Sequence, residues 1–384
     1  MARLAGERHH EGGRSSVSTQ VGASRLGTDE RFFGAEGERI ARLCHRMAER
    51  FARGGRLLAV ARSPAGWSDA RHVAVEFVHP VIVGKRALPA LALAPAQLDS
   101  LAEPDDMVIA FDPEEDLGLP RDRGCLTIAF CPQTEADWVF VPPVPDPFVA
   151  QELVETLYHF LWEHVHVFFE HRGLLEGRHA KRVHDSGASS FLYPFLGEQE
   201  KDLDAVISDV HASVLMKARE IADLRAQTLE ENRQELMAAA DELRAGGRLL
   251  ALGNGGSATD AMDLVADFAG RAAIDLTADS AILTAIANDI GTEAIFARQV
   301  IAYGRAGDTL VALSTSGNSD NVIAALAEAR RRSIATVAFV GYDGGRVAAE
   351  RLADHVVVTR SEHIPRIQEA QASAYHLLRE LVEA

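Results

Sequence analysis

Two short loops in the second half of the chain have the composition of a phosphate-binding site. Residues 253–257 read Gly-Asn-Gly-Gly-Ser, and residues 314–319 read Ser-Thr-Ser-Gly-Asn-Ser. Glycines let the backbone approach a ligand closely, and the N-terminus of a following helix offers N–H groups and a favourable dipole. Hydroxyls and N–H groups around one turn can surround phosphate oxygens without a lysine. The alternative is that the hydroxyls only cap helices, but two such loops in one domain favour a phosphate site.

The elements that must position these loops are those of an α/β domain. After a helical lead over 203–245, short apolar segments alternate with amphipathic ones. Strands are predicted near 248–253, 280–284, 309–314, 335–340 and 355–358, and helices at 258–269, 292–302, 319–331, 345–352 and 366–383. Such alternation is typical of a mostly parallel sheet with helices on both faces. Ligands bind outside the carboxyl ends of such strands, where both loops fall.

The chain also repeats itself. Residues 54–59 and 246–251 both read Gly-Gly-Arg-Leu-Leu-Ala, and each copy follows a helical segment and opens a predicted strand. Two later matches follow in the same order: residues 106–111 with 308–313, and residues 151–163 with 368–380. We therefore predict a tandem duplication. The predicted organisation is a disordered tail at 1–30, a degenerate first copy at 31–171, a linker at 172–200 and a complete second copy at 201–384.

The ordered motifs of the second copy resemble those of the sugar isomerase (SIS) domain family, and more narrowly those of the phosphoheptose (D-sedoheptulose 7-phosphate) isomerases. Besides the two loops, the motifs are residues 260–262 (Asp-Ala-Met), 287–289 (Ala-Asn-Asp), 343–345 (Asp-Gly-Gly) and 366–369 (Arg-Ile-Gln-Glu). The resemblance implies two tandem flavodoxin-like SIS domains, with parallel sheets and helices on both faces, and a homotetrameric parent.

The resemblance also implies which residues bind a sugar phosphate. Ser314, Thr315, Ser316 and Ser319 fall where the family holds the phosphate. The other positions at which substrate contact is expected are Asn254, Gly255, Gly256, Ser257, Arg271, Asp289 and Gln368.

Aldose–ketose interconversion through an enediol needs a base that moves a proton between two carbons, and an acid or metal that polarises the oxygens. The family uses a His and a Glu four residues apart on one helix face, with a Gln and a His on the last helix, and the four can bind zinc. The matching residues of the second copy are Asp263, Asp267, Gln368 and His376. We expect them to bind zinc or another divalent metal with more oxygen donors than usual, with Asp267 and His376 as catalytic residues. The alternative is a solvated acidic helix face.

The first copy has the family's residues at the same four positions, namely His72, Glu76, Gln151 and His159. These form the alternative metal set, with Glu76 and His159 as further catalytic candidates. The first copy has no phosphate loop, because residues 112–116 read Asp-Pro-Glu-Glu-Asp, and four acids would repel a phosphate.

Each copy thus retains what the other has altered. Because sites of the parent family lie between subunits, we hypothesise a homodimer that forms a pseudo-tetramer of four SIS units, with composite or unequal sites. The alternative is that the first copy is kept only for assembly, and its His and Glu are relics.

Composition narrows the classes of partner. The formal net charge of −17 argues against nucleic acid or an anionic membrane as a partner. We find neither a secretory signal at the N-terminus nor an apolar run that could span a bilayer, and the three cysteines are expected to be free thiols. A cytoplasmic protein with no nucleotide cofactor is predicted.

Three functions remain open. The first is an intramolecular oxidoreductase that interconverts sedoheptulose 7-phosphate, or a similar ketose phosphate, and an aldose phosphate. The second is a non-catalytic phosphosugar-binding or regulatory SIS protein, which would account for the altered Asp263 and Asp267. The third is an enzyme that acts on a related phosphorylated sugar through a metal with oxygen ligands.

Overall fold

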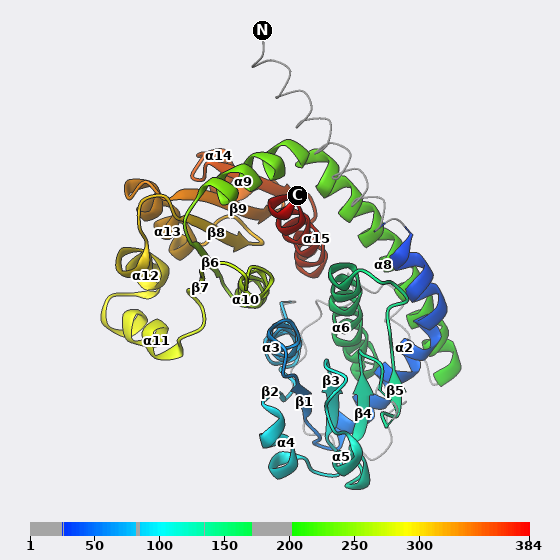
Figure 1. The fold of residues 1–384 in the computed structure, drawn as a ribbon. Coiled ribbons are helices and arrows are strands. Elements are labelled where there is room, and N and C mark those ends of the chain that lie inside the picture. The colour runs from blue at the N-terminus through cyan, green and yellow to red at the C-terminus, as the bar shows by residue number, and fades with distance from the viewer. Residues whose placement is uncertain (1–24, 26, 82–84, 134, 171–201) are drawn as a thin grey trace. The chain divides into compact units, whose positions relative to one another are not determined.

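The chain contains two compact units, seen in a computed structural model that describes residues 25, 27–81, 85–133, 135–170 and 202–384 (Figure 1). Residues 29–219 form the N-terminal unit, and residues 220–384, with the described residues before Asp29, form the C-terminal unit. The predicted linker at 172–200 and most of the predicted tail at 1–30 lie outside the described residues. None of the helices in the described part of the chain is long and apolar enough to cross a membrane.

The N-terminal unit opens with a long helix and then alternates short strands with helices. Its helices are α2 (Thr28–Ala52), α3 (Pro64–Val78), α4 (Pro95–Leu101), α5 (Gly118–Asp122) and α6 (Pro147–Glu170). Its strands are β1 (Leu57–Val60), β2 (Ala90–Leu93), β3 (Met107–Ala110), β4 (Leu126–Ala129) and β5 (Trp138–Val139). The first part of α8 (Leu203–Glu231) packs into the same core through residues such as Val210 and Val214.

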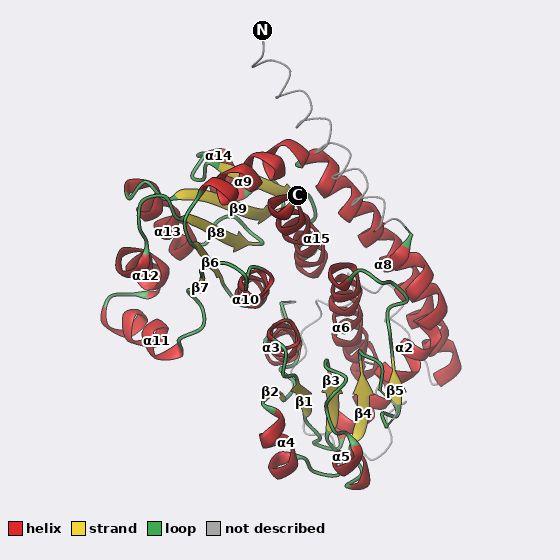
Figure 2. Cartoon of the chain, viewed as in Figure 1, coloured by secondary structure: helices red, strands yellow, loops and turns green. Residues whose placement is uncertain are grey.

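These strands form one parallel sheet in the order β2-β1-β3-β4-β5. Every residue of β1, β3 and β4 is buried, as expected for parallel strands that are covered on both faces. In β1, Leu57 and Ala59 face a core shared with α2, α3 and α6, whereas Leu58 and Val60 face a smaller core shared with α4. Alternation along one strand therefore fills both layers. Figure 2 shows the strands and helices of this unit.

The C-terminal unit repeats this plan. Its helices are α9 (Arg233–Ala245), α10 (Gly256–Asp267), α11 (Ser280–Asp289), α12 (Ile295–Tyr303), α13 (Asp320–Arg331), α14 (Gly345–Ala349) and α15 (Ile364–Glu383), with a 3₁₀ turn at Thr292–Ala294. Its strands are β6 (Leu249–Gly253), β7 (Ala273–Asp275), β8 (Thr309–Ser314), β9 (Ala335–Gly341) and β10 (His355–Thr359). They are parallel in the order β7-β6-β8-β9-β10, which is again 2-1-3-4-5 along the chain. The predicted fold class, two flavodoxin-like α/β domains, is confirmed.

Two predictions for the C-terminal unit need correction. The apolar segment 280–284 is not a strand but the start of α11, because the Asp279 carboxylate accepts the N–H groups of Ala281 and Ile282 and so caps a helix. The sheet edge is formed instead by the short strand β7. The helical lead over 203–245 is interrupted at Asn232, whose side chain pairs with the backbone of Val358 in β10.

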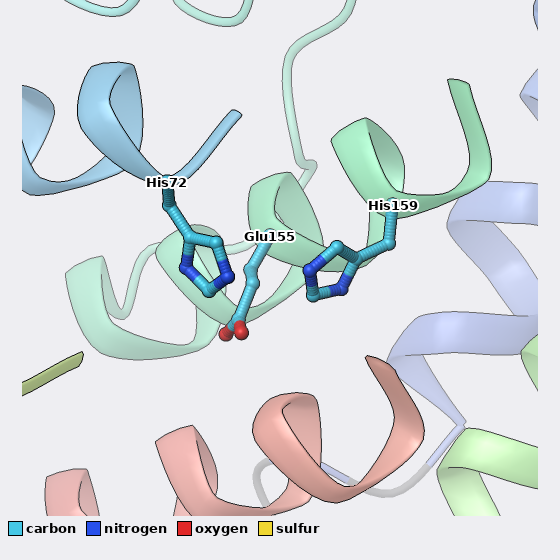
Figure 3. Close-up of side chains that lie close together, drawn as sticks. All are labelled: His72, Glu155 and His159. Carbon is cyan, nitrogen blue, oxygen red and sulfur yellow. The ribbon is translucent and has the colours of Figure 1, made fainter. Parts of the chain in front are cut away.

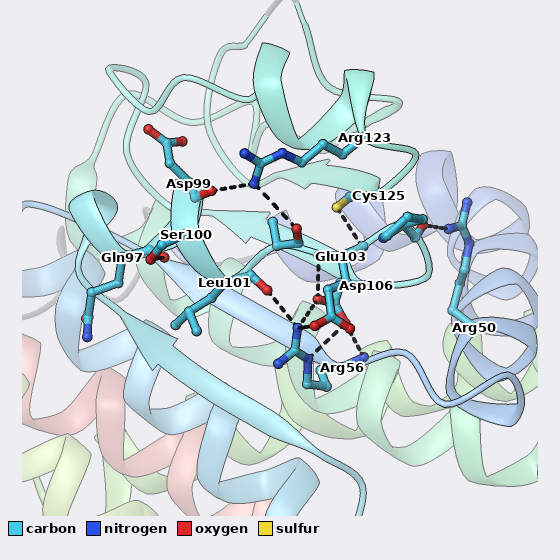
Figure 4. A network of polar contacts seen from close by, with 12 residues as sticks. Arg50, Arg56, Gln97, Asp99, Ser100, Leu101, Glu103, Asp106, Arg123 and Cys125 are labelled. Carbon is cyan, nitrogen blue, oxygen red and sulfur yellow. Dashed lines mark hydrogen bonds and ion pairs between the residues drawn. The ribbon is translucent and has the colours of Figure 1, made fainter.

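The two units also share partly buried polar contacts between strands, here called braces. In Figure 4, Arg56 lies at the start of β1 and donates to the Asp106 carboxylate (2.6 Å) and to the carbonyl of Leu101 (2.7 Å). Arg248, before β6, makes the same two contacts with Asp308 and with the carbonyl of Tyr303, each at 2.6 Å. Both Arg–Asp pairs join the first strand of a sheet to the turn before its third strand.

A second brace recurs between the fourth and fifth strands. The Asp137 carboxylate accepts the N–H and hydroxyl of Thr127, and Asp354 accepts the same two groups of Thr336. In each case the Asp N–H donates back to the Thr hydroxyl. Equal strand order and equal braces support the predicted tandem duplication.

The three cysteines, Cys44, Cys125 and Cys131, are free and buried, as predicted. Burial raises the pKa of the Cys131 thiol to about 12, which makes it a poor nucleophile at neutral pH.

Candidate functional site

Two loops of the C-terminal unit meet at the carboxyl edge of the sheet. Residues 253–257 follow β6, and residues 314–319 follow β8. The two strands are parallel neighbours with Gly253 opposite Leu313, so both loops leave the sheet at the same edge. The amides of Asn254 and Asn321 exchange hydrogen bonds of 3.0 and 2.9 Å, which ties the first loop to the helix that follows the second. The fold therefore brings the two predicted loops together at one edge of the sheet.

The backbone of both loops depends on glycine at two positions. Gly255 precedes α10 with φ of +57°, a conformation that side chains disfavour. Gly317 has φ of +62°, and a Cβ added there would lie 2.2 Å from the carbonyl oxygen of Gly344. The carbonyl of Gly317 in turn accepts the N–H of Val347. The predicted Asp-Gly-Gly motif at 343–345 thus packs directly against residues 314–319, which we call the Ser/Thr loop.

The hydroxyls of the Ser/Thr loop are gathered around one turn. Ser314 Oγ accepts the N–H of Gly317 at 3.2 Å and lies 3.5 Å from Ser319 Oγ. Ser316 Oγ accepts the N–H of Asn318 at 3.2 Å. Ser314 is buried, whereas Thr315, Ser316 and Ser319 are partly exposed. Several hydroxyls beside the N-terminus of α13 form a suitable receptor for an anion such as a phosphate.

A second group of predicted residues comes together between α10 and α15. His376 Nε2 lies 3.4 Å from Asp263 Oδ2 and 3.6 Å from Asp267 Oδ2. The Tyr375 hydroxyl donates to Asp263 Oδ2 at 2.9 Å. One ligand atom from each of Asp263, Asp267 and His376 lies within 4.8 Å of the others. Two carboxylates and an imidazole are suitable donors for a divalent cation and also a suitable set for proton transfer.

Three other predicted residues lie in different surroundings. Gln368 is buried on α15, eight residues before His376. Arg271 donates to the carbonyl of Leu243 near the end of α9. Asp289 is exposed at the end of α11 and accepts the side-chain amide of Asn288 at 2.7 Å. The hydrogen bond of Arg271 therefore joins the segment before β7 to α9, whereas that of Asp289 is local to the end of α11.

The N-terminal unit brings together a related but different group. His72 and Glu76 lie one turn apart on α3, with 3.9 Å between His72 Nε2 and Glu76 Oε1. His159 on α6 lies beside His72, with 5.1 Å between the ring centroids. Glu155, one turn before His159, completes a set with His72 and His159 whose ligand atoms lie within 4.8 Å of one another (Figure 3). Sequence reasoning missed Glu155, although its spacing of four from His159 places both on one helix face.

Gln151, the predicted fourth member of this group, contacts another residue. Its side-chain amide donates to Asp69 Oδ2 at 3.4 Å, and the Tyr158 hydroxyl reaches Asp69 Oδ1 at the same distance. Burial, followed by the nearby His159, lowers the pKa of His72 well below its ordinary value. These surroundings therefore favour the neutral form of the His72 imidazole.

The N-terminal unit places its own carboxylate at the edge where the C-terminal unit has its Ser/Thr loop. Asp112 follows β3, as Ser314 ends β8. Its carboxylate accepts the N–H of Arg62, the N–H of Ser63 (2.9 Å) and the Ser63 hydroxyl (2.6 Å), directly before α3. Arg62 also pairs with Glu115 at 3.0 Å. An internal anion thus accepts the two backbone N–H groups directly before this helix.

Comparisons with known proteins agree with this division. The SIS domain family model matches residues 218–341. Phosphoheptose isomerase from Roseiflexus sp. (strain RS-1) is 42% identical over 193 residues, which are 46% of this chain and 91% of the relative. Phosphoheptose isomerase from Geobacter sp. (strain M21) is 46% identical over 151 residues, 37% of this chain and 78% of the relative.

A solved structure resembles nearly the whole chain. The C-terminal domain of glucosamine-fructose-6-phosphate aminotransferase from Francisella tularensis covers 92% of this chain and 93% of its own length, with a TM-score of 0.58. At 10% identity this likeness concerns the fold alone. By the identity and coverage of its relatives, and by its two α/β sheets, the chain belongs to the SIS domain family, with a C-terminal unit related to the phosphoheptose isomerases.

Proposed function

We propose that the chain is a phosphosugar isomerase whose active site lies in the C-terminal unit. The proposed substrate is sedoheptulose 7-phosphate or a similar ketose phosphate, which is converted to the aldose phosphate through an enediol. The observation that carries the proposal is the presence, in one unit, of the Ser/Thr loop and the group formed by Asp263, Asp267 and His376. The names of the relatives of this unit, phosphoheptose isomerases, support the same reaction.

The phosphate binds at the Ser/Thr loop in this proposal. The hydroxyls that contact it are those of Ser314, Thr315, Ser316 and Ser319. The N-terminus of α10 lies at the same edge of the sheet and is formed by Gly255, Gly256 and Ser257. Asn254, through its bonds with Asn321, fixes the spacing of the two loops. An anion bound at two helix N-termini is favoured by both dipoles, which offsets the acidic charge of the chain.

The proton transfers fall to the carboxylate–imidazole group. Asp267 takes a proton from C1 of the ketose while O2 gains a proton, and this gives a 1,2-enediol. Return of the carbon-bound proton to C2 and loss of the O1 proton then complete the aldose. His376, whose Nε2 lies within 3.6 Å of Asp267, carries the proton between the two oxygens.

The same donors fit a divalent cation. The ion would be held by Asp263, Asp267 and His376, with the buried amide of Gln368 as a further oxygen donor. Ligands rich in oxygen favour a harder cation than Zn²⁺. When bound, such an ion supplies Lewis-acid polarisation of the sugar oxygens.

Assembly into a homodimer with four SIS units is part of the proposal. No residue of α11 is buried within the chain, although Ile282, Leu283 and Ile286 make it an apolar helix. Ile290, directly after α11, is 55% exposed. A partner that covers this helix would bring the exposed Asp289 into a shared site. Light scattering of the purified protein tests this, and a monomer would contradict it. The free cysteines support a cytoplasmic location.

The alternative is a phosphosugar-binding protein without catalysis. Asp263 and Asp267 replace the His and Glu expected at these positions, and a sensor would need only the Ser/Thr loop. Proton NMR of the protein with sedoheptulose 7-phosphate in deuterated buffer, with and without added divalent metal, separates the two. The isomerase produces aldose anomeric signals and a product deuterated at C2. Shifted substrate signals without conversion would refute isomerisation of this sugar and favour the sensor.

A further inference from the structure

Tyr375 on α15 is a buried residue to which the proposed function gives no role. Its hydroxyl donates to Asp263 Oδ2 at 2.9 Å, and the same carboxylate oxygen lies 3.4 Å from His376 Nε2. Tyr375, Asp263 and His376 are 2%, 3% and 0% exposed. A buried carboxylate is costly unless donors satisfy it. The Tyr375 hydroxyl therefore helps to hold the Asp263 carboxylate beside the His376 imidazole.

The N-terminal unit has a tyrosine at the matching position, Tyr158 on α6. Both tyrosine rings pack edge-on against the histidine that follows them in the sequence. The ring centroids of Tyr375 and His376 lie 4.7 Å apart, with 76° between the planes. Those of Tyr158 and His159 lie 5.1 Å apart, with 77° between the planes. The two tyrosine rings are thus placed alike on their helices.

The two tyrosine hydroxyls contact carboxylates at different positions of the repeat. The Tyr158 hydroxyl reaches Asp69 Oδ1 at 3.4 Å, and Asp69 matches Asp260 of the second copy. The position that matches Asp263 is occupied by His72, whose ring centroid lies 5.3 Å from that of Tyr158. The first copy therefore has an imidazole beside the tyrosine ring, where the second copy has a shorter carboxylate bonded to the tyrosine hydroxyl.

A fixed Asp263 has a consequence for the geometry of the proton transfer. His376 Nε2 lies between two carboxylates, 3.4 Å from Asp263 Oδ2 and 3.6 Å from Asp267 Oδ2. The Tyr375 hydroxyl donates to Asp263, so this carboxylate has a set position from which it can orient the imidazole. A misplacement of about 1 Å in a reacting group costs on the order of 100-fold in rate. The hydroxyl can therefore affect catalysis without contact with the sugar.

We propose that Tyr375 is a positioning residue of the proposed active site, which holds Asp263 so that Asp263 orients the His376 imidazole. The inference rests on the proposed function and refines it, because Asp263 receives an orienting role and the carbon-bound proton is left to Asp267. The hydroxyl and the carboxylate together take the place of the imidazole that the first copy has at this position.

The two tyrosines provide a matched pair of variants in the full-length protein, Tyr375→Phe and Tyr158→Phe. Each variant removes one buried hydroxyl and keeps the ring. Tyr375→Phe should lower kcat by about 10-fold and leave KM within about 2-fold, because the phosphate site is untouched. Tyr158→Phe should leave both constants within about 2-fold. If the NMR assay for isomerisation gives the same kcat for the two variants, the inference is wrong.

A double-mutant cycle with Asp263→Ala tests whether the hydroxyl acts through Asp263. In the Asp263→Ala protein, the further change Tyr375→Phe should lower kcat by less than about 2-fold, because residues of one network do not contribute additively. A further loss as large as that in the unchanged protein would overturn positioning through Asp263.

The ring nitrogens of His376 give a readout that does not need turnover. Nitrogen-15 NMR of protein labelled at histidine detects them, and His376→Gln identifies their signals. Tyr375→Phe should shift these signals, and Tyr158→Phe should not. Unshifted signals in Tyr375→Phe would overturn the inference, whether or not the protein isomerises the sugar. A shift in a protein that converts no sugar phosphate would support the positioning of His376 and contradict only the proposed function.

Discussion

The two units have the same sheet topology but differ in the side chains at the carboxyl edge of the sheet. In the C-terminal unit, β8 ends in Ser314, and hydroxyls gather beside the N-terminus of α13. In the N-terminal unit, β3 is followed by Asp112, whose carboxylate takes the N–H groups of Arg62 and Ser63. One edge is therefore suited to an external anion, and the other is satisfied by its own anion. Under the proposed function, the residues that follow the third strand therefore distinguish a phosphate-binding edge from a structural one.

What the two units share is equally informative. The Arg56–Asp106 and Arg248–Asp308 pairs, and the two Thr–Asp braces, keep the same geometry in both sheets. These contacts hold strands together, and they lie away from the carboxyl edge. The scaffold has thus stayed constant while the residues at the edge and on the closing helices have diverged. The predictions below test that separation, from the largest expected effect to the smallest.

The largest effect is expected from Asp267→Asn in the proposed active site. Loss of the proposed base should lower kcat by about 10²–10⁴-fold, which is the usual contribution of a general acid or base. The NMR assay for isomerisation measures it. The control is Asp241→Asn, because Asp241 is exposed on α9 and forms an ion pair with Arg244, one turn away on the same helix. A kcat within a factor of about three of the unchanged protein would remove Asp267 from the mechanism.

Ser314→Asp copies the N-terminal unit into the C-terminal one. A carboxylate at this position should compete with the phosphate for the same donors and repel it, and kcat/KM should fall by more than about 100-fold. Ser314→Ala, which removes one hydroxyl without adding charge, should cost only about 10-fold, in line with one hydrogen bond to a charged group. Equal losses in the two variants would mean that Ser314 is structural rather than part of the phosphate site.

The reverse change, Asp112→Ala, should destabilise the N-terminal unit. It leaves the donors of Arg62 and Ser63 without their acceptor, at a cost of about 2–4 kcal/mol in the free energy of unfolding. Sulfate should restore part of this loss by occupying the vacated position, which denaturant unfolding with and without sulfate can measure. Asp116→Ala is the control, since Asp116 is exposed. A variant as stable as the unchanged protein would refute the role of Asp112 as an internal anion.

The smallest effect is expected for the pH dependence of stability that the two Arg–Asp braces produce. Burial raises the pKa of Asp106 and of Asp308, but hydrogen bonds from Arg56 and Arg248 outweigh it, so both pKa values lie below the ordinary value. A depressed carboxyl pKa adds stability above the unfolded pKa of about 3.9, and this stability is lost as pH falls through the folded pKa. Asp106→Asn and Asp308→Asn should each flatten the acid limb of the stability profile to a similar extent. A clear difference between them would show that the braces are not equivalent.

Much of the fold could be predicted from local patterns. Strands such as 309–314 are continuous apolar runs flanked by turn residues, and their alternation with helices indicates a parallel sheet before any contact is known. The prediction of a strand at 280–284 was wrong because a short apolar run fits a strand or a helix equally well. The deciding residue was Asp279, whose side chain caps the helix, and whether a given Asp caps is settled only by the backbone around it.

The site was predictable where spacing along one helix decides it. Asp263 and Asp267, four residues apart, meet His376 as expected. Glu155 was missed because its position does not match any family residue in the repeat, whereas Gln151 does. In the fold, Gln151 contacts Asp69, and Glu155, one turn later on α6, lies beside His72 and His159. The sequence likewise showed that residues 112–116 would repel a phosphate, but the capture of Asp112 by the backbone before α3 depends on tertiary contacts.

The central claim is that each chain has one sugar-phosphate site and that it lies in the C-terminal unit. Isothermal titration calorimetry with sedoheptulose 7-phosphate measures the number of sites per chain directly. We predict one site per chain, abolished by Ser314→Asp and retained in Asp112→Asn. Two sites per chain, or one site that survives Ser314→Asp, would contradict the account.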